Sequence, residues 1–125
     1  MNKKQIEAVL ALSGPERVKH FAKVVADREE AWSLYDDGWA SSATDDGAPA
    51  FPLWPAHDYA QLRAAQEWSN YSPRAIALYE LMESLIPMLS EQSAAVAVFQ
   101  TPEGRSVTVA PDELLAMLAS ELERY

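Results

Sequence analysis

The chain has 125 residues and a mass of 13.9 kDa, which is the size of one domain built on one hydrophobic core. Its 19 acidic residues against 10 Lys and Arg give a net charge of -9, which disfavours nucleic acid and anionic membrane surfaces as partners. Cysteine is absent, which excludes disulfides, zinc–thiolate sites, iron–sulfur clusters and thiol nucleophiles. Because we find neither an apolar leader nor an apolar run of membrane-spanning length, we expect a cytoplasmic protein with a single domain over residues 1–125.

The first part of the chain predicts two helices. Apolar residues spaced three and four apart within residues 3–12 indicate a short helix. Ser13 and Pro15 then supply a cap and a first-turn proline for a second helix. The buried stripe of this second helix is expected to consist of Val18, Phe21, Ala22 and Val25.

The pattern then changes to that of β-strands. Residues 32–35 and 39–41 flank Asp36-Asp37-Gly38, which predicts a hairpin because Asp-Gly supplies the positive φ of a tight turn. With a three-residue turn, the two residues next to it, Tyr35 and Trp39, face the same side. A third strand is expected over residues 50–55, and Pro52 places it at a sheet edge or at a strand end.

The second half of the chain predicts three more helices and a second hairpin. One helix opens at Pro55, and another opens at Ser72-Pro73 and carries a wide apolar stripe over residues 78–89. Pro87 is expected to kink or end that helix. Residues 95–99 and 106–109 form the second hairpin, and the last helix starts near Pro111. We therefore predict an α+β fold: a small, mostly antiparallel sheet of two hairpins and an edge strand, packed with about five helices.

Residues for catalysis or metal binding are few. His20 and His57 are the only histidines, and without the i, i+4 spacing of a zinc helix they give no ligand set. We interpret both as structural and predict neither a metal nor a cofactor. If the turns at Asp36-Asp37 and Asp45-Asp46 met at one end of the sheet, their four carboxylates would attract Ca²⁺ or Mg²⁺. The interpretation we favour is that Asp occurs there because its short side chain hydrogen-bonds the backbone of turns.

Aromatic residues are unusually dense between residues 32 and 59. The group consists of Trp32, Tyr35, Trp39, Phe51, Trp54 and Tyr59. We expect most of it to be core, whereas any ring left uncovered beside acids would make a binding patch, since Trp and Tyr dominate interface hot spots. The candidate binding residues are Trp39, Trp54, Tyr59, Asp37 and Asp46.

Two segments carry a family resemblance. Residues 32–40 read Trp-Ser-Leu-Tyr-Asp-Asp-Gly-Trp-Ala, and residues 51–55 read Phe-Pro-Leu-Trp-Pro. With these segments the chain resembles, over nearly its whole length, the bacterial family called domain of unknown function 2750. The resemblance implies a small stand-alone bacterial protein. It implies no activity and assigns no catalytic residue.

Three hypotheses about function remain open. The one we favour is a non-enzymatic binding or adaptor protein with an acidic, aromatic surface and a partner protein that is itself basic; an immunity protein that neutralises a basic toxin is one version. The alternative is a small-molecule-binding protein or enzyme with a pocket lined by Trp39, Trp54 and Tyr59, and with Asp46 or His57 as its polar group. The third is a homo-oligomer that associates through the aromatic strands.

Overall fold

The two N-terminal helices form as the sequence predicts. The structure, a computed structural model, describes residues 2–44, 46–66 and 68–124. Helix α1 (Lys3–Leu10) starts with a capping box in which Asn2 and Gln5 each accept a hydrogen bond from the other's backbone N–H. Helix α2 (Gly14–Arg28) is capped by Ser13, whose Oγ accepts a hydrogen bond from the backbone N–H of Glu16 at 3.3 Å. The predicted stripe of α2 is buried in the core.

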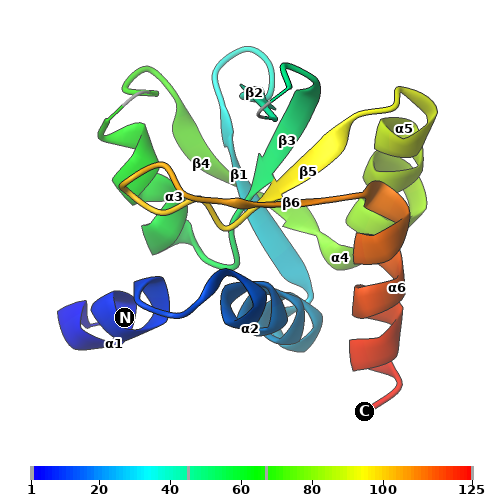
Figure 1. The fold of residues 1–125 in the computed structure, drawn as a ribbon, viewed down its shortest axis with the longest axis horizontal. Helices are drawn as coiled ribbons and strands as arrows, with labels where there is room; N and C mark the ends of the chain where they lie inside the picture. The colour runs from blue at the N-terminus through cyan, green and yellow to red at the C-terminus, as the bar shows by residue number, and fades with distance from the viewer. Residues whose placement is uncertain (1, 45, 67, 125) are drawn as a thin grey trace.

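The strands form two small sheets, and β1 of one contacts β3 of the other (Figure 1). In the first, β1 (Glu30–Tyr35) pairs antiparallel with β4 (Ser72–Ala77). In the second, the strand order is β2 (Ser42–Ala43), β3 (Pro49–Leu53), β5 (Ala95–Val98) and β6 (Val107–Val109), and only the β3–β5 pair is parallel. Trp32 at β1 and Trp54 just after β3 exchange two backbone hydrogen bonds of 2.8 Å, which join the two sheets.

The first predicted hairpin is wrong in its pairing. Residues 39–41 do not form a strand, and of this hairpin only the bridge between Tyr35 and Trp39 is present. The partner of β1 is instead β4, where the sequence had predicted the start of a helix. Leu78 donates its N–H to the carbonyl of Glu29, and from that pair onward hydrogen-bonded and non-hydrogen-bonded pairs alternate along the two strands. Pro73 therefore falls in a non-hydrogen-bonded pair, where its missing N–H would point away from β1, and so it is tolerated there.

The third predicted strand exists, but it is not an edge strand. β3 lies between β2 and β5. Pro52 fits there because its backbone points toward β1, where its carbonyl accepts a 2.6 Å hydrogen bond from Ser33 Oγ. The neighbouring residue Leu53 faces β5, since its carbonyl accepts the N–H of Phe99 at 2.8 Å. The missing N–H of Pro52 therefore removes no hydrogen bond to β5.

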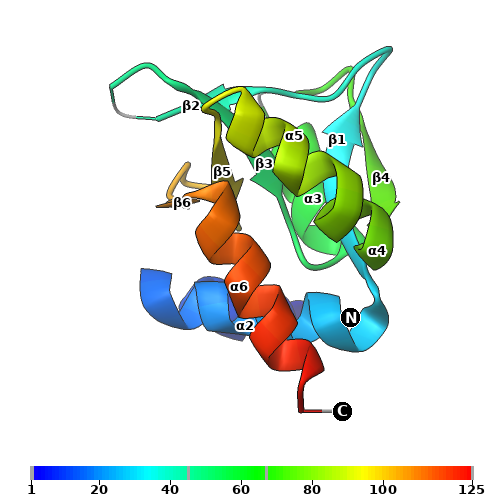
Figure 2. The same cartoon turned by 90° about the vertical axis from the view of Figure 1, so that its right-hand side faces the viewer.

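Helices surround the sheets on three sides (Figures 1 and 2). The bounds are α3 (His57–Ala64), α4 (Leu78–Glu80), η1 (Leu81–Leu85), α5 (Ile86–Glu91) and α6 (Pro111–Leu122). Because α4, η1 and α5 follow one another without a break, we call them helix 78–91. Its middle turn η1 is π-helical, and it immediately precedes the turn that contains Pro87. The sequence had predicted a kink or an end at Pro87, and the structure shows a π turn beside it.

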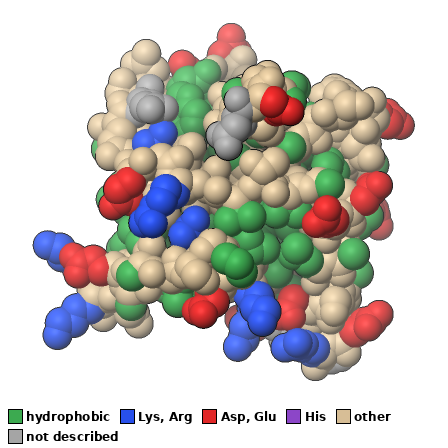
Figure 3. All heavy atoms as spheres, in the orientation of Figure 1, with side chains coloured by type: hydrophobic (Ala, Val, Ile, Leu, Met, Phe, Trp, Pro, Cys, Tyr) green, Lys and Arg blue, Asp and Glu red, His purple; other side chains and the backbone are tan. Residues whose placement is uncertain are grey.

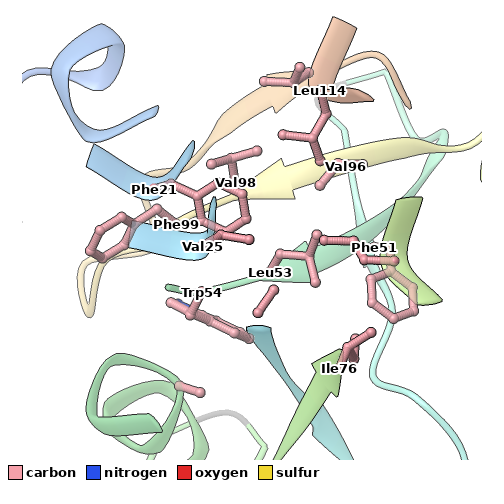
Figure 4. Packing of buried hydrophobic residues seen from close by; sticks show 14 of the residues in the cluster. Phe21, Val25, Phe51, Leu53, Trp54, Ile76, Val96, Val98, Phe99 and Leu114 are labelled. Atoms are coloured by element: carbon pink, nitrogen blue, oxygen red, sulfur yellow. The ribbon is translucent and has the colours of Figure 1, made fainter. Parts of the chain in front are cut away.

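One buried cluster holds these elements together, as Figure 4 shows. It takes Phe21 and Val25 from α2, Leu53 from β3, Val98 from β5 and Leu114 from α6. With helix 78–91 counted as one helix, the described residues form five helices and two mostly antiparallel sheets, which confirms the predicted α+β class. Among those residues, none of the helices is long and apolar enough to cross a membrane.

Candidate functional site

Two of the predicted binding residues belong to the core. Trp54 has no exposed surface, and its indole N–H donates to the carbonyl of Gln100 at 2.9 Å. Its ring meets that of Trp68 edge to face, with the centroids 6.3 Å apart. Tyr59 is 2% exposed, and its ring centroid lies 4.7 Å from that of Phe99. For these two residues the core interpretation is the one that the structure supports.

Trp39 lies at the surface instead, within an aromatic cluster. It is half-buried, and its ring centroid is 5.1 Å from that of Tyr35 and 5.7 Å from that of Phe51. The guanidinium of Arg74, on β4, lies 4.3 Å from the Tyr35 ring centroid and 5.7 Å from the Trp39 ring centroid. These distances are those of cation–π contacts, which fix the two rings against β4.

Asp37 and Asp46 are exposed and lie on separate turns. Asp37 adopts the left-handed φ of 53° in its turn. The side chain of Thr44 donates a hydrogen bond to Asp46, and this bond, followed by backbone hydrogen bonds, lowers the pKa of Asp46. Figure 2 shows the two turns at opposite ends of the upper edge of the molecule. Asp45 lies outside the described residues, and within those that are described no group of three His, Asp or Glu side chains is placed to hold a metal ion.

The three predicted aromatic binding residues occupy different environments. Trp39 and Tyr59 line two separate pockets, and Trp54 has no exposed surface. In the part of the chain that is described, these three rings therefore do not line a common pocket. His57, one of the two polar groups considered for such a pocket, is exposed, with its Nδ1 3.2 Å from Asp58.

The structure adds a groove that the sequence analysis did not find. It lies between helix 78–91 and α6, has a volume of about 550 Å³, and we call it the Tyr79 groove. Its lining consists of Glu29, Ala77, Leu78, Tyr79, Met82, Glu83, Leu115 and Leu122. Tyr79 is 70% exposed, and Leu122 at the other side of the groove is also exposed. No basic residue is among the lining residues, whereas Glu29 and Glu83 are.

Trp39 lines a second hollow on the other side of the same helix. This Trp39 pocket has a volume of about 330 Å³ and lies between β4 and helix 78–91. Arg74 and Glu80 are its charged lining residues. Met88, which is 42% exposed, is the lining residue that α5 contributes. The π turn η1 therefore has one hollow on each side, and π-helical turns occur frequently at functional sites.

A signal for the Tyr79 groove was present in the sequence. The apolar stripe of residues 78–89 is wider than the single face that a helix buries against one neighbour. Leu78, Leu81, Ile86 and Leu89 are buried in the core. Other apolar residues of the same helix, including Tyr79 and Met88, find no neighbour to pack against in the core and remain exposed.

Charge is distributed unevenly along the chain. Six of the ten Lys and Arg residues, but only three of the nineteen acidic residues, lie within residues 1–28. In Figure 3, Lys and Arg side chains lie over α1, α2 and the end of α6 in the lower part of the molecule, and further ones lie on its left side. The hollow between α2 and α6 has Lys19, Lys23 and Arg124 in its lining. The remainder of the chain, including helix 78–91, holds sixteen of the acids.

Comparison with known proteins gives a family without an activity. No curated protein and no solved structure matches the chain. The model of the family described as "Protein of unknown function (DUF2750)" matches residues 18–118, from the start of the α2 stripe to the buried Leu118 of α6. That range includes both sheets, the Trp39 pocket and all the lining residues of the Tyr79 groove except Leu122. The resemblance that residues 32–40 and 51–55 indicated is thus confirmed, and the chain belongs to the DUF2750 family.

Proposed function

We propose that this protein is a non-enzymatic binding protein that docks a basic partner protein on helix 78–91. The observation that carries the proposal is the Tyr79 groove, where a 70% exposed tyrosine lies beside apolar walls and acidic residues. Tyr is one of the residue types most enriched in interface hot spots, and a contiguous apolar hollow with a polar rim is typical of an interaction site.

The charges around helix 78–91 support a basic partner. Glu29 and Glu83 line the Tyr79 groove, Glu80 lines the Trp39 pocket, and Arg74 is the only cation among the lining residues of the two. A partner with apolar side chains flanked by Lys or Arg matches this pattern, and opposite charges speed its encounter with the surface. Neutralisation of a basic toxin is one form that this function takes.

The candidate acids support binding rather than catalysis. A carboxyl group that acts as a general acid near neutral pH needs a raised pKa, whereas the pKa of Asp46 is lowered by its hydrogen bond to Thr44. Asp37 is exposed to water in its turn. We also place the protein in the bacterial cytoplasm, because its lack of cysteine suits a reducing compartment.

The test compares capture of partner proteins from host lysate by the wild-type chain and by matched variants. Tyr79→Ser removes the exposed ring of the groove, and Leu62→Ser is its control, since Leu62 is an exposed apolar residue on α3 that lines neither hollow. Glu83→Lys reverses a charge in the groove. Glu91→Lys is its control, because it changes the net charge equally at an exposed position outside the two hollows.

We expect one protein to be captured by the wild-type chain and by both controls, and to be lost with Tyr79→Ser and Glu83→Lys. Truncation of a hot-spot residue costs about 2 kcal/mol or more, which lowers the affinity at least about thirtyfold. Equal capture by Tyr79→Ser and Leu62→Ser contradicts the proposal. Equal loss of capture with Glu83→Lys and Glu91→Lys would show that only the overall charge of the protein matters, which contradicts the proposal. A wild-type dimer that Tyr79→Ser converts to a monomer would show that a second copy of the chain occupies the groove, which also contradicts the proposal.

A further inference from the structure

The basic hollow between α2 and α6 is as large as the Tyr79 groove. Its volume is about 560 Å³, and we call it the Lys23 groove. Its lining consists of Lys19, Ala22, Lys23, Ala116, Met117, Ser120, Glu121 and Arg124. None of these residues lines the Tyr79 groove or the Trp39 pocket, so the Lys23 groove is separate from the docking surface proposed on helix 78–91.

The charges of the Lys23 groove are opposite in sign to those of the Tyr79 groove. Three of its lining residues are cations, and the one acid among them, Glu121, forms an ion pair of 3.5 Å with Arg124. Lys19 and Lys23 lie about one turn apart on α2, and both are exposed. Helix α6 therefore contributes to two grooves, one with acidic and one with basic lining residues.

The Lys23 groove also has an apolar floor. Ala22 is buried, Met117 is half-buried, and Ala116 is exposed beside them. Two of these side chains end at Cβ, which leaves room for side chains of a partner, and the flexible Met side chain adapts to what enters. Figure 3 shows hydrophobic side chains between α2 and α6, with Lys and Arg side chains below them. A partner that combines apolar and acidic side chains is complementary to such a surface.

The backbone around the groove favours a helical partner segment. All of its lining residues except Arg124 belong to α2 or α6, and Arg124 lies just beyond the end of α6. An extended peptide needs the free N–H and C=O groups of a strand edge, whereas a helix pairs its own backbone and docks through side chains. The α6 residues of the lining extend from Ala116 to Arg124, which is about two turns and about 12 Å. A docked helix of at least two turns matches this length.

We propose that the Lys23 groove docks an acidic amphipathic helix of a partner protein. The apolar side chains of that helix lie against Ala116 and Met117, and its Asp or Glu side chains face Lys19 and Lys23. A nucleic acid extends well beyond the groove and is repelled by the net charge of -9. A short helix responds mainly to charges within about 8 Å, and in the groove these are mostly positive.

The probe is a peptide of about 14 residues built from the repeat Leu-Ala-Glu-Leu-Leu-Ala-Glu, which forms a helix with an apolar stripe and acidic flanks. The control peptide has Gln in place of every Glu. Each peptide carries a fluorescent label, and anisotropy measures its binding to the full chain. We expect the Glu peptide to bind saturably below about 1 mM and to bind more weakly as the salt concentration rises. The Gln peptide should bind about tenfold more weakly, because it keeps only the apolar contacts.

Matched variants assign the binding to the groove. Lys23→Glu reverses a charge in it, and Lys4→Glu is the control, because it changes the net charge equally at an exposed position on α1. Ala116→Phe fills the groove without a change of charge, and Ala8→Phe makes the same substitution at an exposed position on α1. We expect Lys23→Glu to weaken the Glu peptide about tenfold, since an attraction becomes a repulsion, and Ala116→Phe to abolish saturable binding. Both controls should bind like the wild type.

Several results would overturn the proposal. The Glu peptide fails to bind saturably, or the Gln peptide binds equally well. Lys4→Glu weakens binding as much as Lys23→Glu, which would show that only the overall charge matters. Ala116→Phe binds like the wild type, which would place the peptide elsewhere. Displacement of the Glu peptide by a short single-stranded DNA of equal affinity would show a general site for polyanions, and a wild-type dimer that Ala116→Phe converts to a monomer would show that a second copy of the chain occupies the groove.

Discussion

The unpaired hydroxyl of Tyr59 predicts that its removal stabilises the free protein. Replacing a buried tyrosine usually costs stability because a hydrogen bond is lost, but here no described residue pairs with the hydroxyl. Tyr59→Phe keeps the ring and its contact with Phe99 at 4.7 Å. Leaving a polar group buried and unpaired costs about 1–3 kcal/mol, while removal of one oxygen atom leaves only a small void. We therefore expect the variant to gain about 1 kcal/mol in the free energy of unfolding.

Thermal and urea denaturation measure this gain. For a chain of this length, an entropy of unfolding of about 2.1 cal/mol/K per residue converts 1 kcal/mol into a rise in Tm of about 4 °C. Tyr79→Phe, at a 70% exposed position, should change the free energy of unfolding by less than about 0.5 kcal/mol. A loss of stability in Tyr59→Phe would refute the reasoning, because it would show that the hydroxyl has a stabilising partner.

The pH dependence of Tyr59→Phe gives an independent check. Burial, the largest cause, raises the pKa of Tyr59. As the pH rises through about 10, the tyrosine ionises in the unfolded chain while the folded chain resists ionisation, so wild-type stability falls. Tyr59→Phe removes this contribution and should lose less stability than the wild type between neutral and alkaline pH. Parallel curves for the two proteins would contradict burial of the hydroxyl.

Three further changes probe the junction of the sheets, the core and the basic side. Ser33→Ala leaves the Pro52 carbonyl without its 2.6 Å hydrogen bond and should cost about 1–2 kcal/mol in urea denaturation, whereas an unchanged midpoint would show that this bond is not needed to join the sheets. Trp54→Phe removes a buried indole N–H that donates to a backbone carbonyl and leaves a cavity, so we expect a loss of about 3 kcal/mol; a loss below about 1 kcal/mol would place this ring outside the core. Burial, and then the charge of Arg28, lower the pKa of His20, so as the pH falls below about 6.5 the unfolded chain takes up a proton that the folded chain resists. Wild-type stability should therefore fall more steeply than that of His20→Gln between pH 7 and pH 5, and equal slopes would contradict this.

Local signals predicted the elements well, whereas partners far along the chain decided the pairing. Ser13 and the apolar stripe of α2 are local, and both are as expected. The pairing of β1 with β4 joins segments separated by more than thirty residues, and no local pattern encodes it. Pro73 misled the prediction because a proline fits equally the first turn of a helix and a strand position whose N–H points away from the neighbouring strand.

Burial of the aromatic residues depends on the same long-range arrangement. Trp39 and Trp54 both follow or end strand-like segments, yet Trp54 is fully buried because its backbone pairs with Trp32 where the two sheets meet. Trp39 follows a turn and remains half-buried at the surface beside β4. The sequence pattern located the aromatic cluster but could not separate its core members from its surface members.

The overall charge is a good guide to large partners and a poor one to small ligands. A macromolecule contacts many residues and therefore responds to the sum of -9, which is the reason to expect a basic protein on helix 78–91. A small ligand responds to charges within about 8 Å, the screening length at physiological ionic strength. The pocket that Tyr59 lines draws six of its seven lining residues from the stretch before residue 29 and from the capping position of α3, and only Tyr59 comes from within that helix. Within residues 1–28 there are six basic residues and three acidic ones, so the local charge there is opposite in sign to that of the whole chain.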